Sequence, residues 1–188
     1  MNLLRNSVLL LTLGLGLTTH AHAGIIYLSA DGEWSEFSVD DFSSVSQGVE
    51  WIDTTDSNSP EFGSTLTYQF TIATGFKGHL SVVDAGFAGD RFEIFNNGLS
   101  IGITSETSSD IDYSNNFESN LASTDFSKHI FTLTEGTYNI TGGLFSTLQP
   151  FNATNGALKL DVTPVPVSGT LGLLFIGLSI ITLARRRF

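Results

Sequence analysis

One hairpin limits what this 188-residue chain can fold into more than any other local feature. Residues 91–95 alternate polar and apolar side chains, Asn97-Gly98 follows, and residues 99–103 alternate again. An Asn-Gly pair tolerates the positive φ angles that both central positions of a tight type I′ turn require. The pattern therefore predicts two antiparallel strands joined by a two-residue turn. Two strands alone are marginally stable in water, so more strands must complete the sheet.

The same period of two recurs elsewhere in the chain. It is clearest in residues 66–72, where Leu, Tyr, Phe and Ile alternate with Thr and Gln, so one face is apolar and the other polar. Further strands are expected at residues 25–28, 34–42, 49–52, 80–83, 130–134, 137–141 and 157–162. Loops are expected at residues 53–63, 84–90 and 105–125. This many short strands predict an all-β fold, an antiparallel β-sandwich of jelly-roll type.

The N-terminal segment has the pattern of a secretory signal peptide. Arg5 precedes an apolar core at residues 7–17, and Ala21-His22-Ala23 provides small residues at positions 21 and 23. The apolar core is too short to span a bilayer. We therefore expect signal peptidase to remove residues 1–23 and to leave Gly24 as the new N-terminus.

The C-terminal segment combines a breaker, an apolar helix and positive charge. Residues 171–184 form an apolar run that predicts one transmembrane helix. The uncharged stretch 169–184 would span roughly 24 Å as a helix, just short of a bilayer core of roughly 30 Å. Arg185, Arg186 and Arg187 then predict a membrane stop that stays on the cytoplasmic side. The residues before the helix are Val165, Pro166, Val167, Ser168 and Gly169. Prolines at 164 and 166 favour an extended backbone, which a protease can bind as a strand.

This three-part tail resembles the PEP-CTERM sorting signals that exosortases process; these are membrane transpeptidase-like enzymes of biofilm-forming Gram-negative bacteria. The Val-Pro and Ser-Gly pairs match, whereas the usual Pro-Glu-Pro is replaced by Pro166-Val167-Ser168. The resemblance implies an exported protein, held in the membrane as a precursor and then cut near residues 165–169. An ordinary C-terminal membrane anchor is the alternative.

The expected organisation is therefore a signal peptide (1–23), a β-sandwich domain (24–163) and a sorting signal (164–188). The central domain carries all 19 acidic residues of the chain against four basic ones, a net charge of −15. That charge repels nucleic acid and anionic lipid. Since the chain has no cysteine, disulfides and thiol chemistry are excluded, and 15 phenylalanines supply the core. Residues 83–98 also resemble a Gly-Asp-x-Phe-x-Val-x-x-Asn-Gly hairpin of secreted bacterial and fungal sandwich domains, which supports the fold.

Catalytic candidates are few in the central domain. His79 and His129 are its histidines, and no Gly-x-Ser-x-Gly sequence accompanies them. A carboxylate pair for glycoside hydrolysis stays open because acidic residues are abundant. Trp34, Trp51 and Tyr113 lie outside the best-patterned strands and are candidates for carbohydrate contact.

The loop residues indicate calcium as the candidate metal ion. Ca²⁺ takes six to eight oxygen ligands, and Asp84 and Asp90 bracket a glycine-containing loop beside the hairpin. The same two residues are alternatively turn caps. Residues 110–114 resemble the start of an EF-hand loop, but Asn115 and Leu121 occupy positions that need Gly and Glu.

These observations predict a non-enzymatic cell-surface or extracellular-matrix protein that serves adhesion or exopolysaccharide and biofilm association. Its expected partners are an exosortase-like enzyme, signal peptidase and polysaccharide. The alternative is a calcium-assisted, carbohydrate-active enzyme on the same scaffold.

Overall fold

A computed structural model describes residues 24–166 as a mostly β structure of two sheets. The first sheet has the strand order β1 (Gly24–Tyr27), β3 (Leu66–Ile72), β9 (Gly136–Ser146), β5 (Arg91–Asn96) and β6 (Leu99–Ile103). The second has β2 (Ser35–Asp40), β10 (Ala153–Pro164) and β4 (Phe76–Phe87). Strands β8 (Lys128–Leu133) and β7 (Tyr113–Ser114) pair with successive segments of β4. The prediction of an all-β fold is confirmed.

One pair of strands departs from the antiparallel prediction. Strand β1 runs parallel to β3, with Gly24 opposite Leu66 and Tyr27 opposite Gln69. Between them the chain crosses to the other sheet, forms β2 and returns, which is the long connection that a parallel pair needs. The other pairs of named strands in residues 24–166 are antiparallel.

The core lies between the two sheets and draws on both. Its centre is aromatic: the Phe37 and Trp51 rings stack with centroids 4.0 Å apart, and Phe92 meets Phe37 edge-on at 5.0 Å. Around them lie buried aliphatic side chains of β3, β4, β9 and β10, including Leu66, Leu80, Ile140, Leu158 and Leu160. Because the chain has no cysteine, this packing must stabilise the domain without disulfides.

Most predicted strands are present, but several differ in extent. Strand β4 continues to Phe87 through a segment expected to be a loop, and residues 49–52 form isolated bridges instead of a strand. The predicted surface excursion at 105–125 contains strand β7 and a short helix, α1 (Phe117–Ala122). The Asn97-Gly98 turn is as predicted, with φ angles of 50° and 78°.

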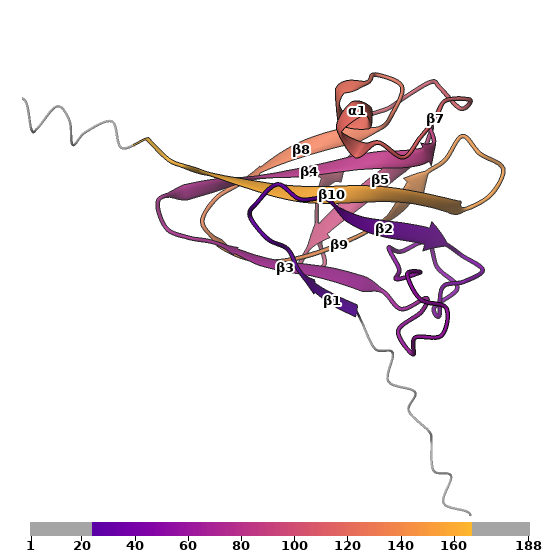
Figure 1. Cartoon of the computed structure of the whole chain (residues 1–188), viewed down its shortest axis with the longest axis horizontal. Coiled ribbons are helices and arrows are strands. Elements are labelled where there is room, and N and C mark those ends of the chain that lie inside the picture. Colours follow the sequence, from indigo (N-terminus) through magenta and orange to yellow (C-terminus); the bar gives the residue numbers. More distant parts are fainter. Residues whose placement is uncertain (1–23, 167–188) are drawn as a thin grey trace, which may run out of the picture.

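The long antiparallel pair of β4 and β10 gives the sandwich two distinct ends. Pro164 pairs with Phe76 at one end, and Asn155 pairs with Ala85 near the other (Figure 1). Twelve residues of β4 span roughly 40 Å at about 3.3 Å per residue. We call the end opposite Pro164 the tip and define it by residues 87–90, 110–114 and 147–152.

No helix within residues 24–166 is long and apolar enough to cross a membrane. The predicted signal peptide (1–23) and the predicted transmembrane helix (171–184) lie outside the described residues.

Candidate functional site

The structure brings Asp84 and Asp90 together at the tip, where β4 turns into β5. Both side chains are buried, with exposed fractions of 0% and 2%. The Oδ2 atom of Asp84 accepts hydrogen bonds from the backbone N–H groups of Gly89 and Asp90, each at 3.2 Å. Asp84 therefore caps the turn, as the alternative interpretation held. The other carboxylate oxygen of Asp84, Oδ1, has no hydrogen-bond partner among residues 24–166.

Burial raises the pKa of both carboxyl groups, and repulsion by Asp90 adds to this effect at Asp84. Burial, together with the neighbouring negative charge of Asp90, raises the pKa of Asp84 to about 8, against the opposing effect of its backbone hydrogen bonds. Burial also raises the pKa of Asp90, although hydrogen bonding from the side chains of Thr147 and Thr154 lowers it. Two charged carboxylates at this site are unfavourable unless a proton or a cation offsets them.

Helix α1 covers this site from outside. Asn120, which is buried, donates through Nδ2 to the backbone oxygens of Asp84 at 3.1 Å and Ser114 at 3.0 Å. The backbone N–H of Asp84 donates to the carbonyl of Ser127 at 2.9 Å. Asn120, Thr147 and Thr154 could not be assigned to this site from the sequence, because they come from segments remote from residue 84 in the chain.

Backbone contacts tie the three loops of the tip together. The N–H of Ala88 donates to the carbonyl of Asp112 at 2.8 Å, and that of Leu148 donates to the carbonyl of Gly89 at 3.2 Å. Gln149 Nε2 donates to the carbonyl of Asp110 at 2.9 Å. The tip is thus one connected surface made from three distant segments.

Exposed apolar side chains gather on these loops. Phe87 is 49% exposed and Tyr113 is 62% exposed, and their rings meet edge-on with centroids 5.1 Å apart. The other exposed apolar residues of the tip are Ile111, Leu148 and Phe151. Tyr113 was a candidate for carbohydrate contact and its exposure fits that role. The sequence did not indicate Phe87 as a contact residue because residues 84–90 were expected to form a loop.

The two tryptophans do not form an open platform. Trp51 is 0% exposed and belongs to the core, so the interpretation of Trp51 as a carbohydrate contact is wrong. Trp34 donates from Nε1 to Glu118 at 2.9 Å, and the Lys159 ammonium lies 4.7 Å from its ring centroid. Its ring is therefore occupied by contacts within the protein.

The other candidates from the sequence are the two histidines and the segment 110–114. His129 packs on Phe131, with ring centroids 4.3 Å apart. The segment 110–114 includes strand β7, and its Asp112 accepts a hydrogen bond from the hydroxyl of the preceding Ser109. Within the described part of the chain, no group of three or more His, Asp or Glu side chains could hold a metal ion. An ion at Asp84 and Asp90 would have to use other oxygen ligands as well.

The predicted sorting motif begins where β10 ends. Val165 and Pro166 are exposed, and the Val165 N–H donates to the carbonyl of Gly75 at 2.8 Å. The rest of the predicted tail lies outside the described residues, namely Val167, Ser168, Gly169, Arg185, Arg186 and Arg187. Ala21 and Ala23 also lie outside them, whereas Gly24 is the first residue of β1.

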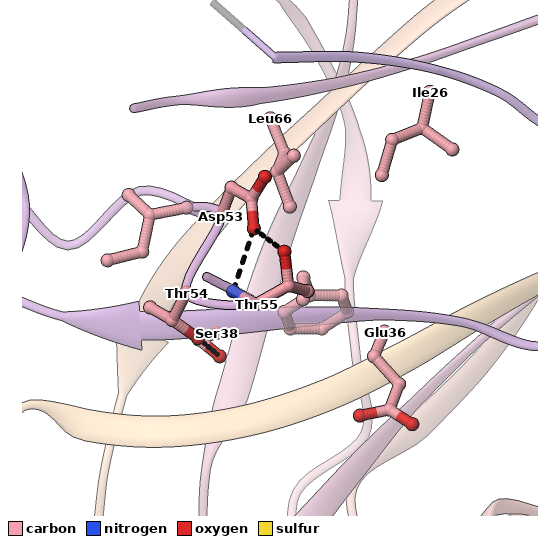
Figure 2. A pocket seen from close by; sticks show the side chains of 9 residues that line it. Ile26, Glu36, Ser38, Asp53, Thr54, Thr55 and Leu66 are labelled. Atoms are coloured by element: carbon pink, nitrogen blue, oxygen red, sulfur yellow. Dashed lines mark hydrogen bonds between the residues drawn. The ribbon is translucent and has the colours of Figure 1, made fainter. Parts of the chain in front are cut away.

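A shallow pocket of about 300 Å³ opens between the sheet edges that β1 and β2 form (Figure 2). Ile26 and Leu66 form an apolar wall, and Glu36 and Asp53 contribute carboxylates. Asp53 Oδ1 accepts from both the N–H and the hydroxyl of Thr55, at 2.9 and 2.6 Å, as the dashed lines in Figure 2 show. One carboxylate is thus already engaged, and the pocket has no exposed aromatic ring among its lining residues.

No family model matches the chain, and no curated protein is similar to it. Among solved structures, the chain is similar to the pre-peptidase C-terminal domain of a collagenase from Bacillus anthracis, at 12% identity and a TM-score of 0.38. The match covers 76% of this chain and 97% of that domain.

Proposed function

We propose that this is an exported, non-enzymatic protein of the cell surface or extracellular matrix of a Gram-negative bacterium, and that its tip binds polysaccharide. An exosortase-like enzyme processes its C-terminal signal, and the body is a sandwich of jelly-roll type. The observation that carries this proposal is the exposed aromatic pair of Phe87 and Tyr113, at the end of the sandwich opposite Pro164.

The chemistry of the pair suits a sugar ring. Exposed aromatic rings offer flat apolar faces that stack on the C–H faces of sugars, and the Tyr113 hydroxyl adds a polar group. The net charge of −15 on the central domain disfavours acidic polysaccharides by repulsion. The expected ligand is therefore a neutral polysaccharide.

The arrangement of the ends supports the same proposal. Strand β10 leads directly into the predicted sorting motif, so a precursor whose tail is still anchored in the membrane is fixed at the Pro164 end of the sandwich. The tip then points away from the membrane, where matrix polysaccharide is found.

The first prediction tests the aromatic pair. The full chain, purified in detergent, is titrated with neutral and acidic bacterial exopolysaccharides in a pull-down assay. Replacing both Phe87 and Tyr113 with Ala should weaken binding of the neutral polymer by about tenfold or more, since each stacked ring contributes roughly 1 kcal/mol. Phe76→Ala, at the opposite end of β4, is the matched control and should bind like the wild type.

Two results would contradict the proposal. Equal binding by the wild type and the double variant would exclude the tip as the binding surface. Release of shorter sugars from the polymer by the wild type, abolished by removing one carboxylate, would favour the enzymatic alternative.

A further inference from the structure

Asp84 and Asp90 form a buried pair. The described residues around the pair neither neutralise its negative charge nor supply hydrogen bonds to all of its oxygen atoms. Within residues 24–166, the Oδ1 atoms of Asp84 and Asp90 are both buried and have no hydrogen-bond partner. A buried polar atom without a partner costs on the order of 1–3 kcal/mol, and more when it is charged. Two such atoms on neighbouring acids indicate that the site takes a ligand that carries positive charge.

The nearby basic side chains are engaged elsewhere. Arg91 donates to Glu106 at 3.2 Å and to the carbonyl of Thr104 at 3.3 Å. Lys159 pairs with Glu118, and Lys128 donates to the carbonyl of Ser123. In the part of the chain that the structure describes, neither aspartate forms a salt bridge.

The surroundings of the pair are rich in oxygen. The side-chain hydroxyl groups of Thr147 and Thr154 lie near Asp90 and lower its pKa. The backbone bends with positive φ at Gly86 (77°) and Gly89 (118°). The Asn155 Oδ1 atom lies so close to Gly86 that an added Cβ there would be 2.6 Å from it. Oxygen donors without histidine or cysteine select a hard cation with flexible coordination, which is the preference of calcium.

We propose that Asp84 and Asp90 together bind one Ca²⁺ ion, with backbone carbonyls, hydroxyl groups and water as its remaining ligands. A divalent cation offsets both negative charges, whereas a shared proton offsets one. The bound ion would hold the β4–β5 loop in place beneath the other loops of the tip. This inference goes beyond the proposed function and does not depend on it, because calcium binding is measured without any polysaccharide.

The experiment uses the full chain in detergent, stripped of metal with a chelator that is then removed. Calorimetric titration with CaCl₂ should give one tight site per chain, and MgCl₂ should bind much more weakly because Mg²⁺ needs a stricter geometry. A hundredfold excess of free Ca²⁺ over its dissociation constant should raise the melting temperature by about 5–10 °C.

Asp90→Asn should abolish both the tight site and the calcium-dependent shift. This variant is preferred to one at Asp84, because Asp84 also accepts the loop N–H groups that hold the turn. Asp56→Asn is the matched control: Asp56 is an exposed turn acid whose Oδ1 accepts from the Asn58 N–H, and its replacement should leave both readouts unchanged.

Hydrogen–deuterium exchange of the wild type gives a readout that needs no variant. Calcium should slow exchange in residues 84–91 more than in the exposed acidic loop at 53–63. The proposal is overturned if calcium leaves the melting curve and this exchange pattern unchanged, or if Asp90→Asn keeps the tight site.

Discussion

At the scale of single residues, Trp51 and Gly142 depend on each other. The indole of Trp51 is fully buried, stacks on Phe37 and lies directly over Gly142. A Cβ atom at position 142 would overlap the six-membered ring of the indole. The close approach of the ring therefore requires glycine at position 142. Any side chain there would displace Trp51 from the aromatic centre of the core.

This contact predicts the effect of Gly142→Ala. The alanine should lower the free energy of unfolding by about 1–3 kcal/mol, because an overpacked ring must leave its stacked position. Gly143→Ala is the control and should cost less, since its Cβ would meet backbone atoms of Val49 and Glu50 no closer than 3.0 Å, whereas the Cβ at 142 would lie 2.3 Å from the indole. Urea unfolding measures both variants, and a larger loss for Gly143→Ala would contradict this account.

The roles of some residues could be predicted from the sequence, and the roles of others could not. The positive φ angles at Asn97 and Gly98 follow from local preference, so they could be predicted. The burial of Trp51 could not, because its segment forms isolated bridges and has no regular alternation. The pairing of Asp84 with Asp90 was expected from their spacing, whereas Asn120 reaches Asp84 from 36 positions away.

At the scale of elements, α1 is short and depends on its two asparagines. Asn116 caps the helix by accepting the Ser119 N–H at 3.0 Å, and Asn120 joins the helix to β4. An isolated helix of six residues is unstable in water, so contacts with β4 must hold it.

The two asparagines give a matched pair of variants. Asn120→Ala should lower the free energy of unfolding by about 2 kcal/mol, because it leaves the Asp84 and Ser114 carbonyls without this donor. Asn116→Ala removes only the cap and should cost about 1 kcal/mol. Thermal unfolding ranks them, and an equal or larger effect of Asn116→Ala would show that the helix does not depend on Asn120.

Strand positions could be predicted where apolar side chains alternate, as in β3 and the β5–β6 hairpin. Strand length could not be predicted for β4. Its final part is buried on both faces, because Ala85 and Gly86 pack under neighbouring segments, so the period of two disappears. The residues of α1 have no helical pattern of their own, and the helix forms because Asn116 caps it and β4 supports it.

At the scale of the whole molecule, the predicted sorting tail follows the folded domain without a linker. Mass spectrometry of the mature protein should find the N-terminus at Gly24 and the C-terminus between residues 165 and 169. Pro166→Ala or Ser168→Ala should leave uncut precursor in the membrane, whereas Val162→Ala, inside β10, should still be processed. A mature C-terminus at Phe188 would show that the tail is an ordinary anchor.

The place of β10 in its sheet determines when this domain can finish folding. Strand β10 is the last strand of the chain, yet it lies between β2 and β4 and hydrogen-bonds to both. Until β10 emerges, β2 has no partner strand in its sheet among the described residues, and one long edge of β4 stays open. A chain that emerges from its N-terminus would therefore have all five strands of the first sheet before β10 appears, but it could not complete the second sheet until β10 follows. Completion of the second sheet and arrival of the tail would then be nearly simultaneous.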